Sequence, residues 1–366
     1  MRRQSPSGHT HSRLRAMVLA SVCAAASMLQ IQTPAEAVGG HCRVTNVRTN
    51  KGDFGDGPNL QAAISDAKAR DTLRITGRCI GNFTVGKSIT LRGVSTARFP
   101  VATLDGGDVR RVLTILKGRV FLRDLRITNG RAIRSGRGGK GGGILNLGEV
   151  LTLRGSTSVE GNVGFYGAGI YSRRAVTLFD RSSVRYNLSG LTCLCTTAGG
   201  GIFIARHGTV DLNDTSTVSH NRSALAGGIF SMGAIVSLDD SSSVRFNTAR
   251  KGGGIFTSED VTLNGSSVVS GNTARIDGGG IFSTGTLTLN DSASIVRNEA
   301  SVDGGGIFSS GLSQVVLYDS SSVIENTAGT AGGGIFISST GTVFLCSDSV
   351  TLSPNSPDDP PATHTC

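Results

Sequence analysis

The chain has 366 residues, 52 of them glycine, with no tryptophan and a formal net charge of +10. Apolar residues make up 38% of the sequence, which excludes a disordered chain, since disorder requires low hydrophobicity and high net charge. Glycine is about twice as frequent as usual but lacks the strict period of collagen, so its abundance indicates repeated turns.

Residues 1–37 are typical of a signal peptide. Arginines precede an apolar run from Ala16 to Ile31, and Ala35-Glu36-Ala37 provides an A-x-A cleavage site. The apolar run is shorter than the roughly 20 residues that span a bilayer. We therefore expect the mature chain to begin at Val38, to be secreted or held at the cell surface, and to lack a transmembrane anchor.

Residues 38–140 are strongly basic, with 20 lysines and arginines against seven acidic residues, whereas residues 141–366 contain 12 and 18. The positive electrostatic potential of such a segment favours polyanionic partners, for example polysaccharides or cell-wall polyanions. Nucleic acid is not expected as a partner outside the cytoplasm, and a protein partner stays open. The candidate binding residues in the basic part are Arg123, Arg126, Arg131, Arg134 and Arg137.

The same basic part is expected to form the N-terminal cap and the first coils of the fold. Leu60, Ala63, Ile64 and Ala67 share one face of a helix if residues 59–67 are helical. A helix with this apolar face can cover the end of a stack of strands and protect its edge from other chains.

Residues 141–345 consist of a repeat of about 26 residues, best seen where an isoleucine follows a block of glycines. The aligned isoleucines are Ile144, Ile170, Ile202, Ile229, Ile255, Ile281, Ile307 and Ile335. The longest interval contains an insertion, Leu188 to Ala198. Each unit holds three short β-type pieces, and these cannot sustain the apolar stripe of a helix.

The three pieces are the G-G-I-F segment, an apolar triplet such as Val261-Thr262-Leu263, and a V-x-x-N segment. Stacked units pair each strand with its copies above and below, which predicts a single all-β parallel solenoid. In the triplet, Val261 and Leu263 should point inward and Thr262 outward. The asparagines should stack at a turn and bond one another through their amides: Asn162, Asn187, Asn221, Asn247, Asn272, Asn298 and Asn326.

These residues resemble two known patterns. The G-G-G-I-F and V-x-x-N segments are similar to the G-G-A-I and F-x-x-N repeats of polymorphic outer membrane proteins. The segments at residues 59–64, 71–75 and 88–93 resemble the opening of pectin-lyase-like proteins. The resemblance implies a right-handed parallel β-helix with three strands per coil and a capping helix. Relatives of this type include adhesins, polysaccharide lyases and glycosidases.

Six cysteines remain in the mature chain, an even number that favours disulfides in an exported protein. Pairing of nearest neighbours, Cys42 with Cys79 and Cys346 with Cys366, would staple both ends of the fold, the second through a C-terminal tail at residues 346–366. Other pairings are open. Cys193 and Cys195 lie in the insertion without a histidine cluster, so a loop staple or free thiols are favoured over a metal or redox pair.

A row of aromatic residues follows the aligned isoleucines. If the isoleucines point inward, alternation turns these rings outward, where they could bind glycans or a protein. A register offset by one residue would place the rings in the core instead, and the sequence leaves both options open. The candidate rings are Phe230, Phe256, Phe282 and Phe308.

Candidate catalytic residues are few. Asp239-Asp240 and His207-Gly208 are similar to elements of polygalacturonases, but a turn-forming aspartate before serine explains Asp240 more simply. We predict no catalytic residue, metal or cofactor. The expected function is non-catalytic binding or adhesion to polysaccharide or cell-surface partners through the lateral faces of the solenoid. The alternative is a lyase or hydrolase of acidic polysaccharide.

Overall fold

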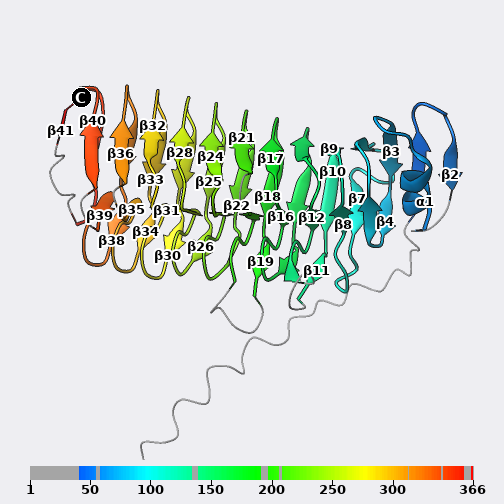
Figure 1. Ribbon diagram of the computed structural model, residues 1–366, viewed down its shortest axis with the longest axis horizontal. Helices are drawn as coiled ribbons and strands as arrows, with labels where there is room; N and C mark the ends of the chain where they lie inside the picture. Colours follow the sequence, from blue (N-terminus) through cyan, green and yellow to red (C-terminus); the bar gives the residue numbers. More distant parts are fainter. Residues whose placement is uncertain are drawn as a thin grey trace, which may run out of the picture. The chain divides into compact units, whose positions relative to one another are not determined.

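A computed structural model describes residues 41–54, 58–133, 139–190, 197–205, 208–311, 313–338, 341–357 and 364–365. These residues, part of the compact unit that spans 40–366, form a parallel β-solenoid of about 10 turns (Figure 1). The strands form three long, mainly parallel sheets, which we call A, B and C, and short strands outside them, which we call D strands. In each repeat the chain passes from sheet C to sheet A, then to sheet B, and in most repeats through a D strand to the next turn.

Sheet A has 14 strands, and its pairs are parallel except that β1 pairs in antiparallel fashion with both β2 and β3. Its strands are, in sheet order, β2 (Gly52–Phe54), β1 (Arg43–Asn46), β3 (Thr72–Thr76), β6 (Ile89–Gly93), β9 (Arg119–Arg123), β13 (Val150–Arg154), β17 (Ala175–Leu178), β21 (Thr209–Leu212), β24 (Ile235–Leu238), β28 (Val261–Leu263), β32 (Leu287–Leu289), β36 (Gln314–Leu317), β40 (Thr342–Leu345) and β41 (His364–Thr365).

Sheets B and C have ten parallel strands each. Sheet B contains β4 (Arg78–Ile80), β7 (Ala102–Asp105), β10 (Leu125–Thr128), β14 (Ser158–Glu160), β18 (Ser183–Arg185), β22 (Thr217–Ser219), β25 (Ser243–Arg245), β29 (Val268–Ser270), β33 (Ser294–Val296) and β37 (Ser322–Ile324). Sheet C contains β5 (Phe83–Val85), β8 (Leu113–Ile115), β12 (Ile144–Asn146), β16 (Ile170–Ser172), β20 (Ile202–Ile204), β23 (Ile229–Ser231), β27 (Ile255–Thr257), β31 (Ile281–Ser283), β35 (Ile307–Ser309) and β39 (Ile335–Ile337).

Most repeats contain a fourth, two-residue strand that the sequence did not predict. These D strands form two small sheets beyond the V-x-x-N turn. They are β11 (Arg131–Ala132), β15 (Val163–Gly164) and β19 (Leu188–Ser189), and β26 (Thr248–Ala249), β30 (Thr273–Ala274), β34 (Glu299–Ala300) and β38 (Thr327–Ala328).

Side-chain alternation fills the interior as expected. Val261 and Leu263 are fully buried whereas Thr262 between them is partly exposed, and the aligned isoleucines also face the core. Equivalent residues pair across coils, for example Ile281 with Ile307. The core is therefore a set of stacked aliphatic rows, which confirms the predicted repeat register.

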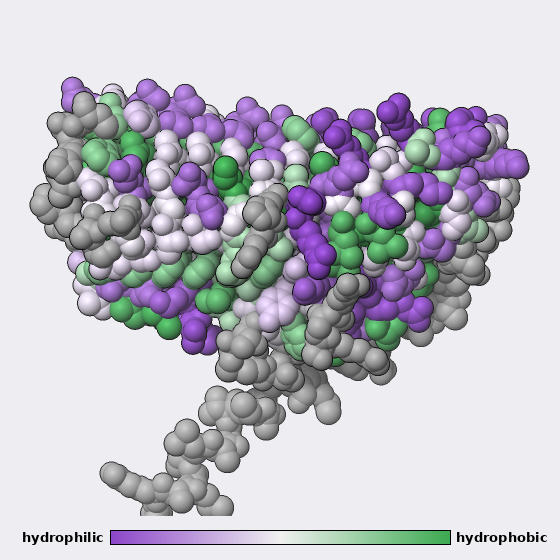
Figure 2. Space-filling model, in the orientation of Figure 1, coloured by the Kyte–Doolittle hydropathy of each residue, from purple (hydrophilic) through white to green (hydrophobic). Residues whose placement is uncertain are grey.

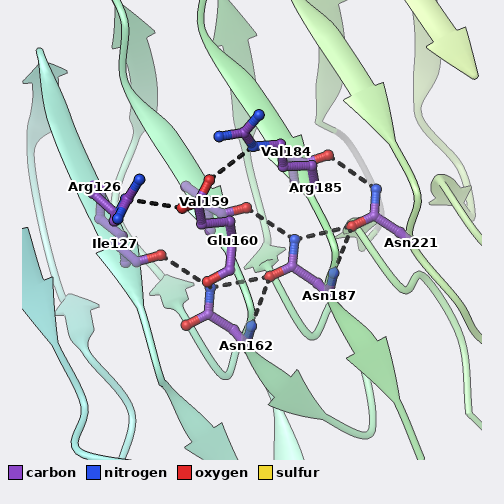
Figure 3. Close-up of polar contacts among 9 residues, drawn as sticks. All are labelled: Arg126, Ile127, Val159, Glu160, Asn162, Val184, Arg185, Asn187 and Asn221. Carbon is purple, nitrogen blue, oxygen red and sulfur yellow. Dashed lines mark hydrogen bonds and ion pairs between the residues drawn. The ribbon is translucent and has the colours of Figure 1, made fainter. Parts of the chain in front are cut away.

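The asparagine row forms a continuous ladder that extends one residue beyond the predicted series, to Asn355 (Figure 3 shows its beginning). Each amide donates from Nδ2 to Oδ1 of the next asparagine, at 2.9–3.2 Å, from Asn162 to Asn355. The same Nδ2 also donates to a backbone carbonyl in the preceding coil, as Asn187 does to Val159 at 2.9 Å. The ladder thus satisfies buried polar groups at every turn, as such groups require.

Two turns explain the other recurrent residues. Gly252 has a φ of +61°, and a Cβ on Gly253 would lie 2.4 Å from the carbonyl oxygen of Gly279 in the next coil, so both positions require glycine. At the turn between sheets A and B, Asp240 has a φ of +57° and its Oδ2 accepts a hydrogen bond from the Asp214 amide at 2.9 Å. This confirms the turn-forming interpretation of Asp240.

The helix α1 (Pro58–Asp66) caps the first coil as predicted, with Leu60 and Ile64 fully buried. Beside it, the Cys42–Cys79 disulfide joins the residue that precedes β1 to β4. Cys346 is also disulfide-bonded, while Cys193, Cys195 and Cys366 lie outside the described residues.

An ion pair at the N-terminal cap predicts how the stability of the fold depends on pH. The buried Asp71 carboxylate accepts hydrogen bonds from Arg48 (2.6 and 2.9 Å) and from Asn46 (2.7 Å), which hold the pKa of Asp71 well below its usual range. A lowered folded-state pKa contributes stability above the unfolded value of about 4, and this contribution is lost as the pH falls. Asp71→Asn should therefore lower the melting temperature at pH 7, and the deficit should shrink steadily below about pH 4. An equal deficit at pH 7 and pH 3 would contradict this.

Candidate functional site

Four arginines form a row across the first coils of sheet A. Arg74, Arg92, Arg123 and Arg154 are direct cross-strand partners on β3, β6, β9 and β13. We call this row the arginine ladder. All four side chains are exposed, and neighbouring strands in a sheet are about 4.8 Å apart, so consecutive coils present one guanidinium each along a straight line.

The core fixes the direction of these side chains. Leu73 precedes Arg74 and Leu122 precedes Arg123, and both leucines are fully buried. Because neighbouring residues of a strand point to opposite faces, each buried leucine turns the following arginine to solvent. The buried leucines therefore fix the backbone positions of the ladder residues and the face to which the arginines point.

Little negative charge compensates the ladder. Among the described residues, the one ion pair to it joins Arg123 Nε to Asp124 Oδ2, at 3.4 Å. At the end of the ladder, the Arg154 guanidinium lies 4.2 Å from the ring centroid of Phe179. Like charges in register repel one another, by roughly 1 kcal/mol or less per pair in water, and salt screens them. A bound polyanion would remove this repulsion.

Other arginines of the basic part differ in having acidic partners. Arg78 pairs with Asp105 at 2.7 Å. Glu160 lies between two arginines on sheet B, with Arg126 Nε at 2.8 Å and Arg185 Nε at 2.7 Å (Figure 3). These pairs stabilise the surface locally and leave less charge for a ligand. In the face shown by Figure 2, strongly hydrophilic residues are denser over the N-terminal coils than over the C-terminal coils.

The candidate arginines identified from the sequence do not share one face. Arg123 is in sheet A, Arg126 is in sheet B and Arg131 is in the D strand β11, because the chain turns around the coil between them. Arg134 and Arg137 lie outside the described residues. Of the three described candidates, only Arg123 belongs to the arginine ladder.

The aromatic row after the isoleucines lies outside the main core but is largely covered. Successive rings from Tyr171 to Phe336 stack with centroids 4.6–5.3 Å apart. Phe230 is 5% exposed, and Phe282 and Phe308 are 8% exposed, while Phe256 is half-buried. The open question of register is thus answered: the isoleucines fill the core, and the rings shield one another on its outside.

A second aromatic row, not recognised in the sequence, is far more exposed. Tyr186, His220 and Phe246 follow the sheet B strands with φ of +54° to +55°, and their ring centroids are 4.8 and 5.2 Å apart. Tyr186 is 57% and Phe246 50% exposed. Partial burial, together with the charges of Arg245 and Arg185, lowers the pKa of His220. Exposed neighbouring rings of this kind, tilted relative to one another, can contact apolar faces of a ligand.

The best carboxylate candidate for catalysis lies on sheet A beyond the ladder. Burial raises the pKa of Asp211, against hydrogen bonds from Thr209 (2.8 Å) and Thr177 (3.4 Å), and the charge of Asp239 raises it further. Asp239 accepts a hydrogen bond from Asn264 Nδ2 at 2.6 Å. The described residues contain no group of three potential metal ligands, and His207 is not among them.

The raised pKa of Asp211 predicts its effect on stability. A carboxyl whose pKa is raised by folding contributes stability below its unfolded pKa of about 4, and this is lost as the pH rises through the folded value. Asp211→Asn keeps an acceptor for Thr209 but removes the charge. We expect it to raise the melting temperature at pH 7 but not at pH 3. The turn variant Asp240→Asn is the control, and a melting temperature raised equally in both variants would contradict the explanation.

The chain matches no known protein family, no curated protein and no solved structure. In the part of the chain that the structure describes, no helix is long and apolar enough to cross a membrane. The function is therefore inferred from the solenoid fold and from the charged and aromatic rows on its surface.

Proposed function

We propose that this protein is a secreted or cell-surface β-solenoid that binds an acidic polysaccharide or a similar cell-surface polyanion, without catalysis. The observation that carries the proposal is the arginine ladder: four exposed guanidinium groups in register, with one carboxylate in contact among the described residues. A linear, repeated cationic surface is complementary to a linear, repeated anion.

The chemistry of arginine supports this ligand class. A guanidinium stays charged at any physiological pH and binds carboxylate or sulfate through two parallel hydrogen bonds. The excess of basic residues in the segment 38–140 adds a long-range field that speeds the approach of a polyanion. Because the strands fix the backbone positions of the four arginines in line, binding requires ordering of their side chains but not of the backbone.

The resemblance to pectin-lyase-like proteins and to polymorphic outer membrane protein repeats belongs to the same proposal. The stacked parallel coils, the glycine turns and the asparagine ladder support it. The predicted signal peptide at residues 1–37 supports export. Adhesion through a lateral face is the activity that this combination favours.

A direct binding test uses the mature protein and immobilised polygalacturonate, with neutral dextran as the matched surface. We expect retention on polygalacturonate that is released as salt increases, and no retention on dextran. Equal retention on both surfaces, or none on polygalacturonate or dextran sulfate, would contradict the proposal.

The second candidate function is cleavage of acidic polysaccharide, which the raised pKa of Asp211 next to Asp239 favours. General acid catalysis requires such a carboxyl, but also a partner base or nucleophile placed around the substrate. We expect the purified protein to release no unsaturated or reducing sugar from pectin, alginate or glycosaminoglycans. Turnover that disappears in Asp211→Asn would establish the enzyme instead.

A further inference from the structure

A small cavity of about 50 Å³ lies on the D-strand face of the solenoid, five coils beyond the start of the arginine ladder. Three exposed arginines line it: Arg222, Arg250 and Arg275. The remaining lining residues are small: Ser223, Ala224, Thr248 and Ala249. We call it the arginine pocket.

The register of the coils brings these arginines together. Arg222 pairs with Thr248 of β26, and β26 pairs in register with β30, so Arg250 and Arg275 follow the two strands at equivalent positions in neighbouring coils. Ala224 occupies that position one coil earlier, and its carbonyl accepts the Arg250 amide at 2.9 Å. The small side chain of Ala224 leaves the space that the longer arginine side chains surround.

No carboxylate of the described residues neutralises the charge of the arginine pocket. Among the described residues, none of the three arginines lies within ion-pair distance of a carboxylate, whereas the adjacent Lys251 binds Asp277 at 2.7 Å. The Ser223 hydroxyl, in a residue only 3% exposed, has no hydrogen-bond partner. The concentration of positive charge is the more unusual because residues 141–366 are acidic overall.

We propose that the arginine pocket binds one tetrahedral oxoanion, a sulfate or phosphate group. Guanidinium groups bind such anions through paired, charge-assisted hydrogen bonds, and three arginine residues line the space. A volume of about 50 Å³ holds only a few water-sized groups, so an anionic head group fits but a whole sugar ring does not. The anion can be a free ion or an ester group that projects from a glycan.

Titration calorimetry with inorganic sulfate and inorganic phosphate tests the proposal, in chloride buffer at constant ionic strength. We expect saturable binding of one anion per chain, weakened at least tenfold in the double variant Arg250→Gln/Arg275→Gln. The matched control, Arg173→Gln/Arg174→Gln, removes two exposed charges elsewhere and should bind within twofold of the parent. Binding that is equal in both variants, or absent for both anions, would overturn the proposal.

Two further titrations complete the experiment. One distinguishes an ester group from a free anion, and the other distinguishes the arginine pocket from the arginine ladder as the binding site. Glucose 6-sulfate compared with inorganic sulfate distinguishes an ester from a free ion, and either should depend on Arg250 and Arg275. The same titrations in Arg92→Gln/Arg123→Gln, which disrupts the arginine ladder, should be unchanged. Loss of sulfate binding in that variant would assign the anion to the arginine ladder and overturn the proposal for the arginine pocket. If the arginine ladder did not bind polyanions, sulfate binding at the arginine pocket would be unaffected.

Discussion

Replacement of Asn247 by alanine is expected to lower the free energy of unfolding by about 2 to 6 kcal/mol. The Asn247 side chain accepts hydrogen bonds from Asn221, through its amide and its Nδ2, and donates to Asn272 and to the Val218 carbonyl. The variant leaves the Asn221 amide buried without its partner and also removes the bonds that Asn247 donates to Asn272 and to the Val218 carbonyl. An orphaned buried amide costs about 1–3 kcal/mol, and each lost hydrogen bond about 0.5–1.5 kcal/mol.

Urea unfolding followed by circular dichroism measures this loss. The matched control is Asn264→Ala, because Asn264 is half-buried and bonds Asp239 and Asn290 at the surface of sheet A. Surface substitutions usually change stability by about 0.5 kcal/mol or less. If Asn247→Ala and Asn264→Ala lowered stability equally, the asparagine ladder would not be the stabilising element that the structure indicates.

The double variant Arg92→Gln/Arg123→Gln should weaken binding to polygalacturonate or dextran sulfate by at least tenfold at low salt. It removes the two central charges of the arginine ladder and interrupts the line of guanidinium groups. Each cation that neutralises an anionic group adds to the dependence of the affinity on salt, as for other polyelectrolytes. The variant should therefore also show a shallower decline of affinity with increasing salt.

Surface plasmon resonance at several salt concentrations provides both quantities. Arg173→Gln/Arg174→Gln has the same net charge as the ladder variant but keeps the ladder, so it should bind nearly as the parent does. Both arginines are exposed and lie outside the ladder. An equal loss in the two variants would mean that overall charge, and not the aligned arginines, determines binding.

The repeat itself predicted most of the fold. The spacing of the isoleucines indicated the coils, the triplet around Thr262 indicated which side chains enter the core, and the V-x-x-N segments indicated the asparagine ladder. These features depend on local alternation and on repetition, both of which are visible in a linear sequence. The two-residue D strands could not be predicted, because their pairing exists only after the coils stack.

The arginine ladder could be recognised only through register. A leucine-arginine pair recurs at Leu73-Arg74, Leu91-Arg92, Leu122-Arg123 and Leu153-Arg154, but these pairs are 18, 31 and 31 residues apart. The first coils lack the regular G-G-I-F period, so the sequence gives no frame in which to align the pairs. The sequence instead indicated arginines that are close together along the chain, but Arg123, Arg126 and Arg131 lie in three different sheets.

The Phe row shows a different limit. Alternation correctly indicated that either the isoleucines or the rings fill the core, but the sequence contained nothing that measured exposure. Phe282 and Phe308 are outside the core and yet nearly buried, because each ring is covered by its copies in neighbouring coils. Conversely, the exposed aromatic row of Tyr186, His220 and Phe246 consists of three unlike residues at one turn position. A search for repeated residues does not detect such a row.

A crystal structure of the mature protein with an oligogalacturonate would test the central claim most directly. The account predicts carboxylates of successive sugars within about 4 Å of the Arg92 and Arg123 guanidinium groups, with the oligosaccharide following the ladder along sheet A. An oligosaccharide bound instead over the stacked rings or at Asp211, with the ladder arginines free of it, would contradict the account.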